Sequence, residues 1–160
     1  MLFLSFAPFN VEDDREYRPM PATTSAVTPA AASAAILKRI RLNLARSKAY
    51  PDGSAQHGYE FVAPLDASGH IDLETWKLNR ARCVVHRFWA NEPIENGYLV
   101  RRAGGTTGAT WVFDYELEGS DDDEAGYRFG DHAFQPGEYV SIRDEDGEMH
   151  TFRVATVEAV

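Results

Sequence analysis

The sequence contains a single cysteine, Cys83, so the chain cannot form an internal disulfide or a cysteine-rich metal site. Such sparse cysteine usage suits a reducing compartment, and we expect a cytoplasmic protein. The chain also lacks an apolar run of about 18 residues, the length that a membrane-spanning helix requires. Segment 1–9 is apolar but short, and acidic residues follow where a signal peptide would carry small ones.

Positive charge is also in short supply. The chain has 16 Lys and Arg against 25 Asp and Glu, which gives a formal net charge of −9 at pH 7. Nucleic acids and anionic membranes both select for a basic surface, so we expect neither as a partner. Hydrophobic residues are not scarce. They make up 44% of the chain, which is enough for the core of one domain.

Residues 1–36 differ in composition from the rest of the chain. Most of this stretch is rich in Ala, Thr, Ser and Pro. Such a segment buries too little surface to offset the entropy of ordering, so we predict a disordered low-complexity tail before a single antiparallel β-domain at 37–160. Two alternatives stay open: a helix capped at Thr28 that runs through 30–35, and docking of segment 1–9 on the domain or on a partner.

The remaining sequence is a series of short β-rich runs separated by Gly, Pro and Asp turn signals. Alternation of apolar and polar residues favours a strand at 40–44, although a helical interpretation of 36–44 competes. A cap at Asp72 favours one short helix with Trp76 and Leu78 partly buried. This helix is expected at 72–79, and further strands are expected at 58–63, 81–89, 97–102 and 110–117. We predict an all-β fold, or a mainly β fold with one short helix: an antiparallel small barrel or bent sandwich of about seven to eight strands.

The C-terminal segment 138–158 carries the sharpest local signal, a β-hairpin. A three-residue loop at 145–147 separates apolar from polar side chains, whereas a two-residue turn mixes them on one face. The favoured register pairs Val140 with Phe152 and Ile142 with His150. The predicted inner face consists of Val140, Ile142, Phe152 and Val154. The same register requires a left-handed residue at Gly147.

No motif in the chain identifies an enzyme. The sequence has no nucleophile elbow, phosphate-binding glycine loop or zinc-protease motif. Its five histidines show no ligand spacing, and Cys83 and His86 fall on opposite faces of a strand. The acidic runs 121–124 and 144–148 are interpreted as solvated turns. We predict no catalytic residues, no metal and no cofactor, and we leave open whether the protein is an enzyme.

One run resembles part of a known family. Residues 134–142, Phe-Gln-Pro-Gly-Glu-Tyr-Val-Ser-Ile, resemble the Pro-Gly-x-Tyr strand of ferredoxin-reductase-like flavin-binding barrels. That family holds its flavin through an Arg-x-Tyr-Ser/Thr motif on a later strand. Residues 153–156 here are Arg-Val-Ala-Thr, so Ala155 stands where the tyrosine belongs. The resemblance is confined to these short runs, and we carry over neither the flavin nor the activity.

Cations and tryptophans gather in the middle of the chain, against its negative background. The candidate binding residues are Arg82, His86, Arg87, Trp89, Arg101, Arg102 and Trp111. Guanidinium groups beside aromatic rings bind carboxylates, phosphates or acidic segments of a partner. A plainer interpretation competes, in which the arginines lie on a solvated face and pair with Asp114, Glu116 and Glu118.

Three hypotheses follow for function. The first is a non-enzymatic binding or interaction module that holds an unknown protein partner on this Arg/Trp-rich surface. The second is a barrel that binds a small anionic or apolar ligand, with or without catalysis, in a cavity lined by His86, Trp89 and Trp111. The third is an assembly protein that pairs through an exposed strand edge or through segment 1–9. The first two differ in whether Trp89 and Trp111 face the same enclosed space.

Overall fold

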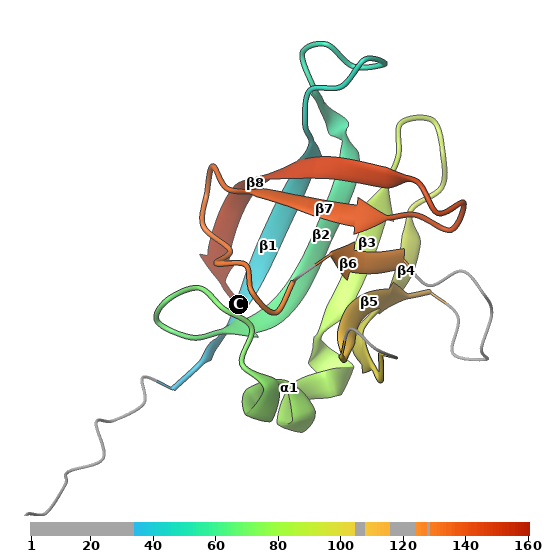
Figure 1. Cartoon of the computed structure of the whole chain (residues 1–160). Helices are drawn as coiled ribbons and strands as arrows, with labels where there is room; N and C mark the ends of the chain where they lie inside the picture. Colours follow the sequence, from blue (N-terminus) through green and yellow to red (C-terminus); the bar gives the residue numbers. More distant parts are fainter. Residues whose placement is uncertain (1–33, 105–107, 116–123, 128) are drawn as a thin grey trace, which may run out of the picture. The chain divides into compact units, whose positions relative to one another are not determined.

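The structure is a computed structural model that describes residues 34–104, 108–115, 124–127 and 129–160. Its elements in chain order are β1 (Ile36–Leu44), β2 (Ser54–Leu65), α1 (Leu73–Asn79), the 3₁₀ turn η1 (Arg80–Arg82), β3 (Val84–Phe88), β4 (Glu95–Arg102), β5 (Thr110–Asp114), β6 (Glu124–Tyr127), β7 (Tyr139–Arg143) and β8 (Met149–Ala159). The strands form a closed antiparallel barrel in which each pairs with the next and β8 returns to β1 (Figure 1). The predicted mainly β fold with one short helix is confirmed, and of the two architectures considered the barrel is the one found.

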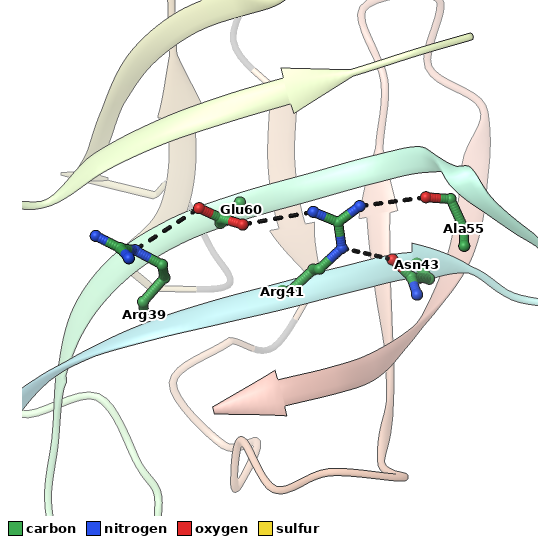
Figure 2. A network of polar contacts seen from close by, with 5 residues as sticks. All are labelled: Arg39, Arg41, Asn43, Ala55 and Glu60. Atoms are coloured by element: carbon green, nitrogen blue, oxygen red, sulfur yellow. Dashed lines mark hydrogen bonds and ion pairs between the residues drawn. The ribbon is translucent and has the colours of Figure 1, made fainter. Parts of the chain in front are cut away.

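Alternation along the strands builds the barrel interior. In β1, Ile40, Leu42 and Leu44 are buried, while Arg39 and Arg41 lie on the outer face (Figure 2). The strand interpretation of this segment is therefore confirmed, and the competing helical interpretation is wrong. The reason is the spacing of two, which places all three apolar residues on one side of a strand, whereas on a helix Leu42 would lie on the side opposite Ile40 and Leu44.

Aromatic rings fill the interior. Between ring centroids, Phe61 lies 5.1 Å from Phe113 and 5.6 Å from Phe134. Tyr59 contacts Phe152 at 5.0 Å, and all five rings are buried. Truncation of a core phenylalanine to alanine typically costs about 3–5 kcal/mol. The centre is thus a packed core of the kind in which side chains fill a small eight-stranded barrel.

The C-terminal hairpin has the predicted register. Val140 pairs with Phe152, and Ile142 pairs with His150. The residues of the predicted inner face are all buried: Val140, Ile142, Phe152 and Val154. Gly147 has φ of +81°, the left-handed conformation that the three-residue loop requires. Local polarity was sufficient here because a slip of one residue would turn the whole apolar face to solvent.

The helix α1 matches the prediction except at one residue. Asp72 caps it as expected, since its carboxylate accepts the Thr75 N–H at 2.7 Å. Trp76 is buried, but Leu78, which was predicted to be partly buried, is 86% exposed. Residues two apart on a helix point roughly 200° away from each other, so only one of this pair can face the barrel.

The strand predicted at 81–89 begins later than expected. The turn η1 occupies Arg80–Arg82, and the Cys83 N–H donates to the Arg80 carbonyl at 3.1 Å. β3 therefore starts at Val84, and the prediction of strand structure for the first residues of the segment is wrong. The helix continues directly into this turn, and the chain becomes extended only where it joins the barrel wall.

Several predictions concern residues outside the described ranges. They are the disordered tail and the alternative helix before residue 34, the last two residues of the strand predicted at 110–117, the acidic loop at 121–123, and the pairing of arginines with Glu116 and Glu118. Glu124, predicted to end that loop, is the first residue of β6. Within the described part of the chain, no helix has the length and apolar character needed to cross a membrane.

On the outer face of β1 and β2, one carboxylate links two arginines (Figure 2). Glu60 Oε1 lies 3.6 Å from Arg39 Nε, and Glu60 Oε2 lies 3.5 Å from Arg41 Nη1. Arg41 also donates to Asn43 Oδ1 and to the Ala55 carbonyl oxygen, each at 3.2 Å. This network ties the two strands together close to the point where their pairing shifts register, after Asn43.

The neighbouring strand β3 joins the same assembly through an aromatic ring. The Arg41 guanidinium lies over the Phe88 ring, 4.3 Å from its centroid. Phe88 pairs with Gly58, which has no side chain to separate the strands. A Cβ at Gly58 would lie 1.9 Å from the Leu42 carbonyl oxygen and 3.0 Å from Phe88 Cζ. Glycine is therefore required at this close approach of β1, β2 and β3.

Candidate functional site

The structure does not bring the predicted binding residues into one place. Trp89 contacts the rings of His57 at 4.8 Å and His150 at 6.4 Å, whereas Trp111 contacts Trp76 at 5.1 Å. These are two separate ring clusters, which we call the Trp89 cluster (His57, Trp89, His150) and the Trp111 cluster (Trp76, Trp111). His86 belongs to neither cluster, and its ring nitrogen Nδ1 bonds to Asn96 on β4. Arg82 is exposed in η1.

Beside the Trp89 cluster, the positive charge of Arg87 already has two acidic partners. Its guanidinium lies 3.2 Å from a Glu92 carboxylate oxygen and 3.4 Å from one of Glu95. The same group lies over the Trp89 ring, 4.7 Å from the centroid. Arg87 therefore organises the barrel rim instead of offering a free cation to a ligand.

His57 is the buried polar side chain of this cluster, and it was not among the predicted site residues. Its Nδ1 bonds to Ser54 Oγ at 2.7 Å, and its Nε2 lies 3.3 Å from the Tyr50 hydroxyl. Both ring nitrogens therefore have partners, which is the ordinary condition of a buried histidine. The contact with Trp89 follows from pairing of β2 with β3, which places the two rings side by side.

A carboxylate and histidine cluster lies at the tip of the β7–β8 hairpin. Asp144, Glu148 and His150 each offer a potential metal-ligand atom, and these atoms lie within 4.8 Å of one another. Asp144 uses both of its oxygens for hydrogen bonds, one to the Glu148 N–H and one to His150 Nε2, each at 2.7 Å. This run was predicted to be a solvated turn, and the contact of His150 with Asp144 was not predicted. The cluster's hydrogen bonds close the hairpin turn.

Two arginines stack on the Trp111 cluster. Arg80 lies over Trp76 at 4.7 Å, and Arg101 lies over Trp111 at 5.2 Å. Stacking of this kind holds a guanidinium in place without neutralising it. Arg102 is different, because it pairs with Asp114 at 2.7 Å, as the plainer interpretation of the arginines predicted.

Beside Trp111 the surface is hollowed into a groove of about 990 Å³, which we call the Trp111 groove. Its lining includes the cations Arg101 and Arg143, one carboxylate, Asp131, and the apolar side chains of Ile71, Phe129 and Met149. Neither arginine forms an ion pair with any residue that the structure describes. Arg143 was not among the predicted binding residues, because it lies on β7, far along the chain from the central arginines.

The indole N–H of Trp111 is the most unusual polar group of the groove. Trp111 is 2% exposed, and its Nε1 is buried with no hydrogen-bond partner among the described residues. The neighbouring Trp76, which is also buried, donates its Nε1–H to the Leu99 carbonyl at 2.9 Å. Leaving a buried donor unpaired costs about 1–3 kcal/mol, and native structures rarely accept that cost without a reason.

The one cysteine does not add a nucleophile to the molecule. Cys83 is fully buried, and burial raises the pKa of its thiol to about 11, while the Arg82 charge opposes that shift only in part. The thiol is therefore protonated at neutral pH, and the thiolate is the reactive form.

Comparison of the chain with family models, curated proteins and solved structures gives no match. The chemistry of the site therefore has to be argued from its own groups. Among the described residues of the Trp111 groove these groups are two guanidinium cations, an indole donor, one carboxylate and several apolar side chains. Such a set favours binding of an amphiphilic molecule.

Proposed function

We propose that the protein is a non-enzymatic binding module whose ligand site is the Trp111 groove. The observation that carries this proposal is the pair of arginines in the groove, Arg101 and Arg143, which have no ion-pair partner in the described part of the chain. Two cations in one groove with no ion pair to any described residue are unexpected in a chain with a net charge of −9. A ligand or an acidic segment of a partner can supply the missing charge.

The size and lining of the groove favour a small molecule over a protein partner. Ligand pockets span about 300–1,000 Å³ and combine an apolar floor with a few polar groups. The Trp111 groove, at about 990 Å³, has this character, with Phe129 and Met149 among its apolar residues. The alternative of a cavity shared by His86, Trp89 and Trp111 has less support, because these residues lie in separate surroundings.

The proposal is tested by the binding of a phenyl-substituted probe to the full chain. We expect 3-phenylpropanoate, 3-phenylpropanamide or both to shift NMR signals of the groove residues saturably. Truncation of Met149, which is 43% exposed in the groove, should weaken binding by about threefold or more because apolar contact is lost.

The matched control is Ile94→Ala, which truncates another exposed apolar side chain outside the groove. This variant should bind both probes as the parent chain does. The proposal is overturned if neither probe binds, or if Met149→Ala and Ile94→Ala have the same effect.

A further inference from the structure

We infer that the ligand of the Trp111 groove carries an oxyanion, a carboxylate or phosphate group, which accepts the indole N–H of Trp111 and lies beside Arg101 and Arg143. This inference rests on the proposed function and names the chemical class of its ligand. It stands on three observations: an unpartnered donor, a glycine beside that donor, and two cations on the same groove.

The indole N–H of Trp111 differs from that of Trp76 because it has no acceptor among the described residues. Trp76 and Trp111 are packed edge to face, both are buried, and each lies under an arginine. Trp76 Nε1–H has the Leu99 carbonyl as acceptor, but Trp111 Nε1–H has none within the described ranges. An indole nitrogen can only donate, so the group that completes Trp111 must be an acceptor.

A glycine lies beside this donor. A Cβ placed on Gly130, another groove residue, would lie 3.7 Å from Trp111 Nε1. The indole nitrogen is therefore covered by the turn at residues 129–131, and no side chain at position 130 blocks an approach. An acceptor of this N–H would therefore lie beside Gly130.

The charge of the acceptor follows from the arginines. Arg101 is held over the Trp111 ring at 5.2 Å, which keeps one cation on the donor's side of the groove. Arg143 supplies a second cation, and among the described residues Asp131 is the one acidic member of the lining. A neutral acceptor would satisfy the indole but leave both guanidinium groups unpaired, so an oxyanion suits the site better.

The deciding experiment follows the indole signals in ¹⁵N–¹H spectra of the full chain during titration. The Trp111 signal is assigned by its loss in Trp111→Phe. With 3-phenylpropanoate or phenyl phosphate it should move downfield saturably, while the Trp76 signal, whose donor is already used, should stay in place. The anionic probes should bind about tenfold more tightly than neutral 3-phenylpropanamide. Whichever anion binds more tightly identifies the carboxylate or the phosphate as the preferred group.

Two variants separate the donor from the cations. Gly130→Ala adds a methyl group at ordinary contact distance, without left-handed strain, and should weaken the anions about fivefold by covering the donor. Arg101→Gln should remove most of the preference for anions, whereas the matched control Arg39→Gln, on the outer face of β1, should not.

The outcomes distinguish this inference from the proposed function. If the amide and the anions bind equally and the Trp111 signal stays in place, the oxyanion inference is overturned and the binding module stands. If Gly130→Ala binds the anions as the parent chain does, the assignment of Trp111 as the donor is wrong. If no probe binds, both the inference and the proposed function are overturned.

Discussion

The arginine network on the outer wall of the barrel gives the sharpest stability prediction. In Arg41→Met the apolar stem is kept, while the guanidinium and all of its contacts are removed. These contacts are the hydrogen bonds to Asn43 and the Ala55 carbonyl and the ion pair with Glu60 (Figure 2), together with the stack on Phe88. Arg39→Met is the matched control, because Arg39 shares the same carboxylate but has only one contact to it, at 3.6 Å.

The expected loss for Arg41→Met is about 2 kcal/mol. Each hydrogen bond to a neutral oxygen contributes roughly 0.5–1.5 kcal/mol. The side chains of Arg41 and Glu60 are 37% and 31% exposed, so screening limits their ion pair to roughly 0–1 kcal/mol. The stack on Phe88 adds about 0.5–1 kcal/mol, and the greater freedom of the methionine offsets part of the sum. For Arg39, which is 52% exposed, the loss should be roughly 0–0.5 kcal/mol.

Urea unfolding followed by tryptophan fluorescence measures both variants. With a slope of about 1–3 kcal/mol per M, a loss near 2 kcal/mol lowers the midpoint by about 1 M. Arg39→Met should stay within about 0.3 M of the parent chain. Equal shifts of the two variants, or a negligible shift for Arg41→Met, would refute the view that the Arg41 guanidinium stabilises this part of the barrel.

Three further predictions follow from particular residues. Gly58→Ala should lower stability by about 2 kcal/mol or more in the same urea assay, since its Cβ would lie 1.9 Å from the Leu42 carbonyl oxygen; a midpoint like that of the parent chain would contradict this. Cys83 should resist thiol reagents at pH 8 and react in denaturant, because burial raises the pKa of its thiol to about 11. Rapid labelling of the folded chain would show that the thiol is accessible. The pKa of Asp66 is lowered, chiefly by the hydrogen bond from the Ser68 side chain, below the ordinary value of 3.8. Its stabilising effect is therefore present above that value and is lost as pH falls through the lower folded pKa, so Asp66→Ala should flatten the acid side of a plot of urea midpoint against pH; an unchanged slope would exclude this carboxylate as the cause.

The sequence predicted those features that depend on neighbours along the chain. The burial of Ile40, Leu42 and Leu44 and the inner face of the C-terminal hairpin follow from alternation, which is a local property of a strand. The cap at Asp72 is local as well. Where the local pattern was mixed, as at 81–89, the prediction placed the start of the strand too early.

The candidate site could be predicted only in part. Arg101 and Trp111 stood out because they lie close together in a chain that is otherwise acidic. Arg143 and Gly130 did not stand out, because they come from a later part of the sequence and lie beside the groove only once the barrel has formed. Nothing in the sequence indicates that Trp76 finds an acceptor while Trp111 finds none among the described residues, since the acceptor of Trp76 is one carbonyl oxygen of β4.

By itself, then, the sequence determined most of the strands, the inward faces of β1 and of the C-terminal hairpin, the hairpin register and the short helix, because each of these follows from periodicity and turn chemistry over a few residues. It did not indicate β6, whose first residue fell in the predicted acidic loop. Tertiary structure alone decided the closure of β8 on β1, the separation of Trp89 from Trp111, and the groove beside Trp111. Those features depend on which strands meet around the barrel. That choice is made by packing of side chains from distant segments into one filled interior, which no local pattern specifies.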